Sequence, residues 1–280
     1  MKFICVGYSK TGTKTMAKAL RTLGFKVDDS FEHMDKRYFW NRIYVADPND
    51  KVAQSPEIFK EIFKNVDACT DSPAYQFWEE ILEAFPEAKV ILVEREEDKW
   101  VSSVQGHFEV ERKENLGGWV VQYLPRQLMQ LLSYEIWIGQ HMHRDLTLGG
   151  AVGVTAPFGP NRCNIMIAKK RYREHNAYVK MKCPKEKLLI WDFKQGWEPL
   201  CKFTGVEKIP NIPVPRENVK AQIVFDALKD NQYLVQEIRK FTVNAVIFVL
   251  LFGSFLGYTI YLYVEKFNNL FGEKENAGEL

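Results

Sequence analysis

Three short apolar runs, at residues 3–6, 89–94 and 187–191, have the length and composition of buried strands. Between them lie longer stretches in which apolar residues recur at the three- and four-residue spacing of an amphipathic helix. Strands that alternate with helices favour packing of the helices on both faces of one sheet. The pattern therefore predicts an α/β layered fold around a central, mainly parallel sheet.

The pattern also predicts where helices begin and end. Apolar positions one helical turn apart between residues 16 and 23 predict an amphipathic helix, and Gly24 is a suitable stop. Ser-Pro pairs at residues 55–56 and 72–73 predict two more helix starts, with Ser as the N-cap and Pro in the first turn. Residues 106–173 interrupt this alternation with many glycines and aromatics, which predicts a lid or insert that contacts the substrate.

Near the C-terminus, residues 243–264 contain no charged side chain. At ~1.5 Å per residue this run is long enough to cross ~30 Å of hydrocarbon, and it predicts a single transmembrane helix in contact with membrane lipid. We therefore expect an N-terminal domain over residues 1–235 and a membrane anchor with a short tail over residues 236–280. Arg239 and Lys240 precede the run, and the tail has more acidic than basic residues, so the domain is predicted to face the cytoplasm. A buried core helix and a luminal domain are the alternatives.

Charge and cysteine content limit the kinds of ligand and partner that this chain is expected to bind. The formal net charge is +2, from 38 Lys and Arg against 36 Asp and Glu, so no global field attracts nucleic acid and any anion must be bound locally. Five scattered cysteines without a C-x-x-C pair argue against a disulfide framework and a zinc site. The sequence gives no indication of oligomeric state.

Residues 7–15, GYSKTGTKT, join the first predicted strand to the first predicted helix. In that context backbone N–H groups and the helix N-terminus can converge on one anion, and Lys10 and Lys14 add positive charge. The loop departs from the nucleotide-hydrolysing pattern G-x-x-x-x-G-K-[ST] because Thr13 separates Gly12 from Lys14. It predicts a phosphate-binding loop, and the alternative is a glycine turn with two solvated lysines.

A second anion site is predicted at the end of the next apolar run. Arg95 follows that run, and Ser103 lies eight residues later on the predicted helix, so a guanidinium and a hydroxyl can bind one phosphate. Glu94, directly before Arg95, leaves a magnesium-dependent P-loop kinase or NTPase open as an alternative. Two anion sites at neighbouring strand ends fit a nucleotide with phosphates on both sides of its ribose.

These motifs are similar to those of a known enzyme family. YSKTGTKTMAKAL with VEREEDKWVSS resembles the phosphosulfate loop and the 3′-phosphate motif of P-loop sulfotransferases that use 3′-phosphoadenosine 5′-phosphosulfate, PAPS. LGFKVDDSFEHM, CTDSPAYQFWEE, YREHNAYVK and GWEPLCKFTG are similar to the branch with RTGT, D-x-P and GWEPLC signatures. The similarity covers about residues 1–218 and is weakest at residues 106–171, where acceptor specificity is expected. Lys10, where this branch often has Arg, and VERE, where TxRD is common, depart from the pattern without removing a needed donor.

The resemblance implies a P-loop-type three-layer fold, PAPS as the cosubstrate and no metal. It implies that the 5′-phosphosulfate is bound by Lys10, Thr11, Gly12, Thr13, Lys14 and Thr15, and the 3′-phosphate by Arg95 and Ser103. In-line sulfuryl transfer to an oxygen or nitrogen requires positioning, charge stabilisation and a base. Lys10 is the residue expected to stabilise charge on the bridging oxygen.

Two residues are candidates for the base. Asp71 stands in the D-x-P signature and is the preferred one, although Asp before a helix is often only a cap or turn residue. His33 in FEHMD is the rival, with packing or hydrogen bonding as its ordinary role. The sequence leaves this choice open.

The expected function is transfer of a sulfuryl group from PAPS to a hydroxyl or amine of a small, lipophilic acceptor. The lipophilic character rests on the predicted anchor and on aromatic residues of the insert, namely Phe108, Trp119, Tyr123, Tyr134 and Trp137. A membrane-tethered nucleotide-binding protein without transfer activity is a further alternative beside the kinase or NTPase.

Overall fold

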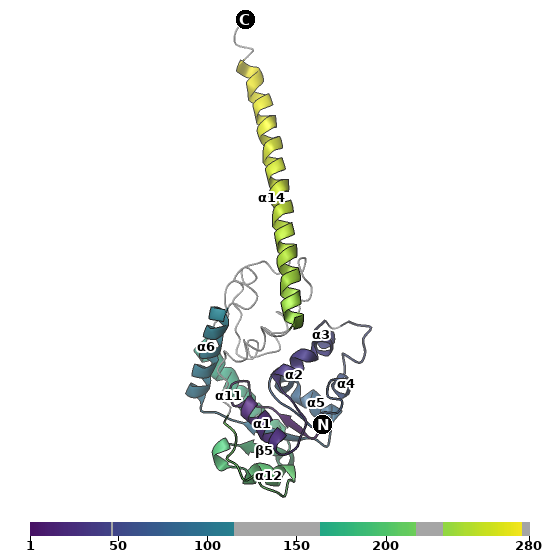
Figure 1. Ribbon diagram of the computed structural model, residues 1–280, viewed down its shortest axis with the longest axis vertical. Coiled ribbons are helices and arrows are strands. Elements are labelled where there is room, and N and C mark those ends of the chain that lie inside the picture. Colours follow the sequence, from purple (N-terminus) through teal and green to yellow (C-terminus); the bar gives the residue numbers. More distant parts are fainter. Residues whose placement is uncertain (46, 115–162, 217–231, 276–280) are drawn as a thin grey trace. The chain divides into compact units, whose positions relative to one another are not determined.

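The computed structural model describes residues 1–45, 47–114, 163–216 and 232–275. They fall into two units, a body made of the first three ranges and a long helix made of the last (Figure 1). The body contains the sequence motifs described above and is considered first.

The body is built on a five-stranded sheet in the order β2-β3-β1-β4-β5, and every neighbouring pair is parallel. Strands β1 (Phe3–Cys5), β4 (Lys89–Val93) and β5 (Leu188–Trp191) are the three predicted apolar runs. Strands β2 (Val27–Asp28) and β3 (Ala68–Cys69) were not predicted, because two residues are too few to form a recognisable run. The predicted α/β fold with a parallel sheet is confirmed.

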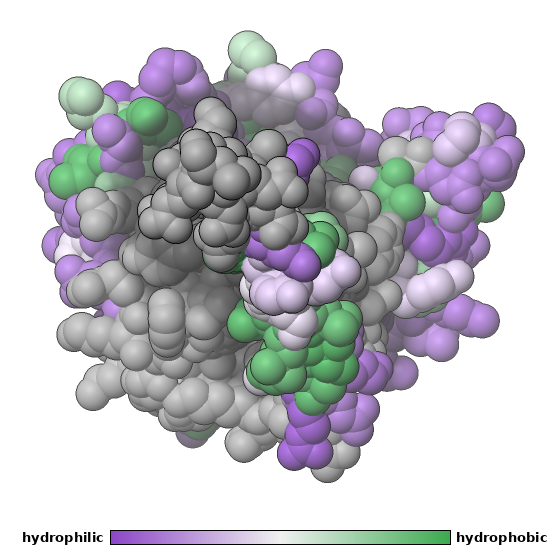
Figure 2. Space-filling view, turned by 90° about the horizontal axis from the view of Figure 1, so that it is seen from above, coloured by the Kyte–Doolittle hydropathy of each residue, from purple (hydrophilic) through white to green (hydrophobic). Residues whose placement is uncertain are grey.

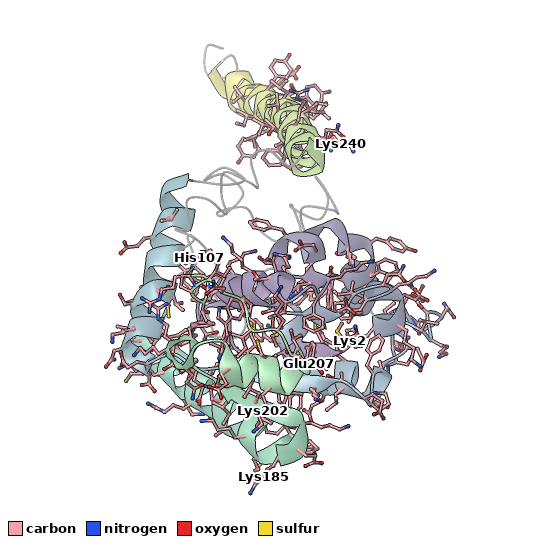
Figure 3. The ribbon with its side chains drawn as sticks, turned by 60° about the horizontal axis from the view of Figure 1, so that its bottom comes forward. Lys2, His107, Lys185, Lys202, Glu207 and Lys240 are labelled. Carbon is pink, nitrogen blue, oxygen red and sulfur yellow. The ribbon has the colours of Figure 1, made fainter. Side chains whose placement is uncertain are left out.

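Helices surround this sheet. They are α1 (Thr13–Thr22), α2 (Ser30–Asp35), α3 (Arg37–Val45), α4 (Ile58–Ile62), α5 (Trp78–Ala84), α6 (Glu97–Glu114), α11 (Ile165–Lys182) and α12 (Glu198–Thr204), with single 3-10 turns η1 (Ala74–Phe77), η2 (Lys185–Lys187) and η3 (Phe193–Gln195). Charged side chains such as Lys185 point outward from the body (Figure 3).

Alternation along β1 separates two hydrophobic layers. Ile4 packs in a cluster that α4 and α5 contribute to, whereas Phe3 and Cys5 pack in a second cluster with α1 and α12. Since successive strand residues point to opposite faces, the sheet lies between two layers of helices. The three-layer arrangement places the carboxyl ends of all five strands at one edge of the sheet.

The predicted helix boundaries are right in one case and wrong in two. The helix expected between residues 16 and 23 is α1, and Gly24 follows its last turn with φ +90°. Helix α4 begins at Ile58, not at Pro56, because the Ser55 hydroxyl donates to the Val52 carbonyl (3.1 Å) instead of capping the helix. After Ser72 the chain forms η1, and no serine side chain caps that turn.

The predicted insert of residues 106–173 is helical at both of its described ends. Helix α6 continues through Gly106 to Glu114, and Phe108 is buried in an aromatic cluster of the body. Helix α11 occupies the other end of the segment from Ile165 onward. The aromatics Trp119, Tyr123, Tyr134 and Trp137 lie outside the described residues.

The second unit is helix α14 (Gln232–Glu275). Its segment Thr242–Lys266 is 25 residues long and is the candidate for a membrane span among the described residues. Large apolar side chains are exposed along it, including Phe255 (67%) and Tyr263 (74%). Figure 2 shows one face of the molecule, on which a group of hydrophobic side chains stands out from polar ones. The predicted C-terminal apolar helix is therefore confirmed.

Candidate functional site

The predicted site residues follow adjacent strands at the carboxyl edge of the sheet. The glycine loop, residues 7–12, follows the central strand β1, Asp71 follows β3 on one side, and Arg95 follows β4 on the other. Asp29 follows β2. Parallel pairing brings these loops together although they are far apart in the sequence.

The glycine loop is tightly packed. A Cβ atom on Gly7 would lie 2.7 Å from the Val93 carbonyl oxygen, and a Cβ atom on Gly12 would lie 2.4 Å from the Phe193 ring. Gly12 has φ +119° and Lys10 has φ 73°, a left-handed conformation that glycine adopts more readily than other residues. The loop therefore forms a narrow turn that leads directly into α1.

Helix α1 begins at Thr13 with Gly12 as its N-cap. Its first internal bond runs from the Met16 N–H to the Gly12 carbonyl (2.9 Å). The N–H groups of a first helical turn precede this ladder and point toward the N-terminus, and Gly12 has no side chain to accept from them. This end of α1 is suited to an anion.

Lys10 lies half-buried beside this turn. Burial lowers the pKa of its ammonium group, Asp71 acts in the opposite direction, and the positive charges of Arg95 and Lys14 lower it further. Three cationic groups thus act on one region, in which Asp71 is the carboxylate that acts on Lys10. An anion bound among them would offset their mutual repulsion.

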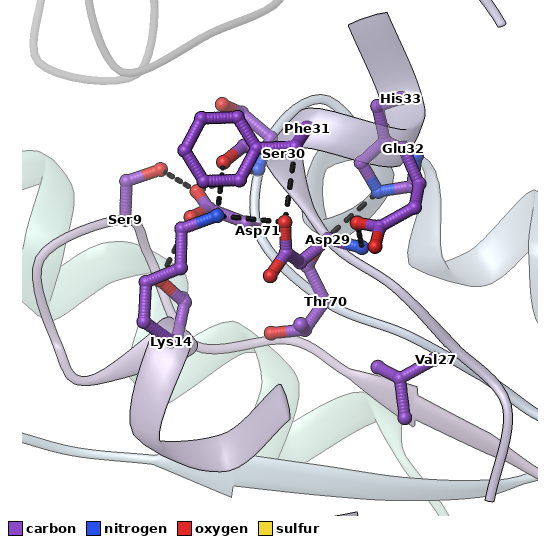
Figure 4. Close-up of polar contacts among 12 residues, drawn as sticks. Ser9, Lys14, Val27, Asp29, Ser30, Phe31, Glu32, His33, Thr70 and Asp71 are labelled. Carbon is purple, nitrogen blue, oxygen red and sulfur yellow. Dashed lines mark hydrogen bonds and ion pairs between the residues drawn. The ribbon is translucent and has the colours of Figure 1, made fainter. Parts of the chain in front are cut away.

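The Asp71 carboxylate is hydrogen-bonded through both oxygens (Figure 4). Oδ1 accepts from the Ser9 hydroxyl and from the Ser72 N–H (2.8 Å), and Oδ2 accepts from the Thr13 hydroxyl (2.8 Å). Asp71 is buried, with φ 70°. It therefore links the end of β3 to the glycine loop and to α1.

Lys14 contacts residues that follow β2. Its ammonium nitrogen lies 2.6 Å from Asp29 Oδ1 and 2.9 Å from the Ser30 hydroxyl, and 3.7 Å from the centre of the Phe31 ring (Figure 4). Burial would raise the pKa of Asp29, but the charge and hydrogen bond of Lys14, with the Phe31 N–H and Glu32, outweigh burial and lower it. Sequence reasoning missed Asp29, since its position depends on the two-residue strand before it.

His33 of α2 lies beside Thr70, the residue that follows β3, in an aromatic environment. Its Nε2 is 3.1 Å from the Thr70 carbonyl oxygen, and its ring meets Trp40 and Phe63 edge to face. A carbonyl only accepts, so Nε2 carries the proton, and the buried Nδ1 has no partner among the described residues. Burial lowers the pKa of His33, which favours the neutral ring.

Arg95 connects the two predicted anion sites. Its Nη1 donates to the Lys10 carbonyl (2.9 Å). Its side chain also borders a hollow of about 430 Å³ lined by Arg95, Asp98, Lys99, Ser102 and Ser103. Asp98 pairs with Lys169, which partly offsets its charge. The two residues predicted for a 3′-phosphate therefore border one hollow.

Glu94, the residue that the kinase or NTPase alternative assigns to magnesium, contacts a lysine. Glu94 forms an ion pair with Lys180 (2.6 Å). The five cysteines are free thiols, and within the described residues no three His, Cys, Asp or Glu side chains lie close enough together to hold a metal. This geometry does not favour Glu94 as the metal-organising residue of an NTPase.

Comparison with known proteins gives two findings. A family model described as "Sulfotransferase domain" matches residues 2–223. The protein "Ava biosynthesis cluster protein M" of Aspergillus versicolor is 29% identical to this chain over 229 residues, which cover 78% of each sequence. The family-model match spans the glycine loop, the residues that follow each strand, and helix α11.

Proposed function

The chain belongs to the sulfotransferase domain family, and from this we propose that it transfers a sulfuryl group from PAPS to a hydroxyl or amine of a small, lipophilic acceptor. The observation that carries the proposal is the contact between the Arg95 guanidinium and the Lys10 carbonyl (2.9 Å). It joins a cationic side chain after β4 to a cationic loop after β1. A nucleotide with phosphates at both its 5′ and 3′ positions presents two anions that suit such a pair.

The residues present fit this donor. PAPS, when bound, supplies an activated sulfuryl group. We propose that its 5′-phosphosulfate is held by Lys10, Thr11, Gly12, Thr13, Lys14 and Thr15, and its 3′-phosphate by Arg95 and Ser103. Gly7 and Gly12 have no space for a Cβ atom beside Val93 and Phe193, so a larger residue at either position would distort the loop proposed to hold the donor. Lys14 would add positive charge from its position against Asp29.

Lys10 is proposed to stabilise negative charge that develops on the bridging oxygen. Its ammonium is partly buried, and electrostatic interactions are stronger where water is excluded. In-line transfer then depends mainly on how the loop places this ammonium.

Asp71 is the proposed base. Its charge acts on Lys10, which supports a position close to the reacting groups, whereas the His33 ring packs against Trp40 and Phe63. The described hydrogen bonds place two donors on Oδ1 and one on Oδ2, so a lone pair of Oδ2 is left to accept a proton. His33 stays the alternative base.

The body is proposed to act at a membrane surface. The span Thr242–Lys266 would anchor the chain, and Arg239 and Lys240 before it favour a cytoplasmic position for the domain of residues 1–235. An enzyme held at a bilayer meets acceptors that partition into lipid. This supports the lipophilic character assigned to the acceptor.

The proposal is tested by incubating the full chain, in detergent or lipid, with sulfur-labelled PAPS and a lysate separated into lipid and soluble pools. We expect label in the lipid pool and none with a Lys10→Ala variant. Magnesium-dependent ATP turnover without binding of adenosine 3′,5′-bisphosphate would favour an NTPase instead. Binding of the bisphosphate without transfer to any hydroxyl or amine would favour a tethered binding protein.

A further inference from the structure

The Tyr172 hydroxyl makes two hydrogen bonds to the backbone of Arg95. It accepts from the Arg95 N–H (2.8 Å) and donates to the Arg95 carbonyl (2.8 Å). A phenol hydroxyl has one hydrogen to donate and two lone pairs that accept. The hydrogen and one lone pair are used on a single residue of the β4–α6 turn, and the hydroxyl also interacts with Asn176. The peptide groups on both sides of the Arg95 Cα atom are therefore held by one side chain of α11.

The Tyr172 ring is itself fixed in place. It stacks on Trp100 of α6 with ring centroids 4.3 Å apart and an interplanar angle of 17°. The Trp100 indole N–H donates to the Ser9 carbonyl of the glycine loop (3.0 Å). Tyr172 is 4% exposed and Trp100 is fully buried. Burial also raises the pKa of Tyr172, so the hydroxyl keeps its proton at neutral pH.

The direction of the Arg95 side chain depends on this arrangement. The guanidinium is exposed and makes one described contact, to the Lys10 carbonyl. Loss of the Tyr172 hydroxyl would leave the Arg95 N–H and carbonyl without these partners and would allow the turn to rotate. Arginine binds phosphate through its planar guanidinium fork, so the strength of this binding depends on the orientation of the guanidinium.

We propose that Tyr172 is a positioning residue that gives the site its preference for a nucleotide carrying a 3′-phosphate, by holding the backbone of Arg95. The inference rests on the proposed function, because it assumes that Arg95 binds the 3′-phosphate of the donor. The 5′ side of the site has its own donors in the glycine loop and α1. Loss of the Tyr172 hydroxyl therefore weakens binding at the 3′ position selectively.

Helix α11 provides a matched control. Tyr178 lies on the same helix, and its hydroxyl also makes a hydrogen bond, to Glu79 (2.8 Å). Tyr178 is 40% exposed and contacts neither Arg95 nor the glycine loop in the described structure. Tyr172→Phe and Tyr178→Phe remove the same oxygen atom from one helix in two different surroundings.

The test compares two nucleotides that differ in one phosphate. Titration calorimetry of the full chain measures the dissociation constants of adenosine 3′,5′-bisphosphate and adenosine 5′-phosphate. We expect Tyr172→Phe to weaken bisphosphate binding about tenfold, which corresponds to about 1.4 kcal/mol, and 5′-phosphate binding by less than about twofold. Tyr178→Phe should change neither constant.

Two more variants show whether the effect passes through Arg95. Arg95→Ala alone should reduce the preference for the bisphosphate, and adding Tyr172→Phe should weaken bisphosphate binding no further. Since the Arg95 side chain is exposed, Arg95→Ala should fold, and an unchanged preference in this variant would overturn the inference even if Tyr172→Phe fails to fold.

Equal weakening of both nucleotides by Tyr172→Phe, or an unchanged preference in Arg95→Ala, would overturn the inference. A wild-type chain that binds the two nucleotides equally would overturn the donor assignment together with it. A wild-type preference that survives Tyr172→Phe would overturn the inference alone.

Discussion

The ammonium group of Lys14 lies 2.6 Å from the Asp29 carboxylate, in a pair whose side chains are 15% and 3% exposed. Asp29 therefore connects α1, which begins at the glycine loop, to the end of β2. Lys14, which is predicted to bind an anion of the donor, is thus already paired with a buried carboxylate of the same chain.

Asp29→Asn should destabilise the fold. The change leaves the Lys14 ammonium without its buried counter-charge, and we expect the free energy of unfolding to fall by about 1–3 kcal/mol. Denaturant unfolding at neutral pH measures this loss. Glu57→Gln removes an exposed carboxylate paired with Lys60 (2.7 Å) and should change stability by less than about 0.5 kcal/mol. Equal effects of the two variants would contradict a structural role for Asp29.

The same pair predicts an acid dependence. The folded state lowers the pKa of Asp29 below its ordinary value of 3.8, so its contribution is fully present above that pH and is lost as the pH falls through the folded-state value. Wild-type unfolding should become easier below about pH 4, and Asp29→Asn should lose part of this dependence. Denaturation midpoints from pH 6 to pH 3 provide the measurement, and parallel curves for the two proteins would refute it.

Lys10→Ala should reduce turnover far more than stability. The ammonium is proposed to act on charge in the transition state, so we expect kcat to fall about 10²- to 10³-fold. Its partial burial beside other cations means that its removal costs little folding energy. Lys18→Ala, an exposed change on α1, is the control and should leave kcat unchanged. A Lys10→Ala protein with normal kcat would remove Lys10 from the reaction.

Substitutions at the two candidate bases should separate their roles. Asp71→Asn keeps the size of the side chain but removes its proton-accepting ability, and we expect kcat to fall about 10²- to 10⁴-fold. His33→Gln should keep most of the activity, because its ring lies among Trp40 and Phe63. Steady-state rates with several acceptors decide between them. Wild-type turnover by Asp71→Asn, with loss in His33→Gln, would reverse the assignment.

Burial of His33 predicts a second pH effect. Its pKa in the folded protein lies below the ordinary 6.5, so the unfolded chain binds more protons as the pH falls past 6.5 and stability decreases. One such group changes the unfolding free energy by at most about 1.4 kcal/mol per pH unit. His175, whose pKa is also lowered by burial, contributes in the same direction. His33→Gln should therefore show a weaker loss of stability between pH 7 and pH 5 than wild type, and an identical slope would contradict it.

The sequence predicts those parts of the fold that consist of continuous patterns. The apolar runs of β1, β4 and β5 are visible because each is buried along its length. The strands β2 and β3 are not, because pairing with neighbours, rather than composition, makes two residues into a strand.

Some residues of the candidate site could also be predicted from the sequence, and others could not. The glycine loop and Arg95 could be found by spacing and by resemblance, since each follows a visible strand. Asp29 and Tyr172 act through contacts with residues 15 and 77 positions away in the sequence, and only the folded arrangement brings these partners together. The roles proposed for Asp71 and His33 stay predictions.

The packing around the glycine loop has a consequence for affinity. Gly7 is confined by the Val93 carbonyl and Gly12 by the Phe193 ring, so the turn between them loses most of its conformational entropy during folding. A ligand that binds such a rigid loop has little further ordering to impose. Even a few hydrogen bonds to this backbone can then give tight association, whereas a substitution that loosened Phe193 would weaken it without removing a single direct contact.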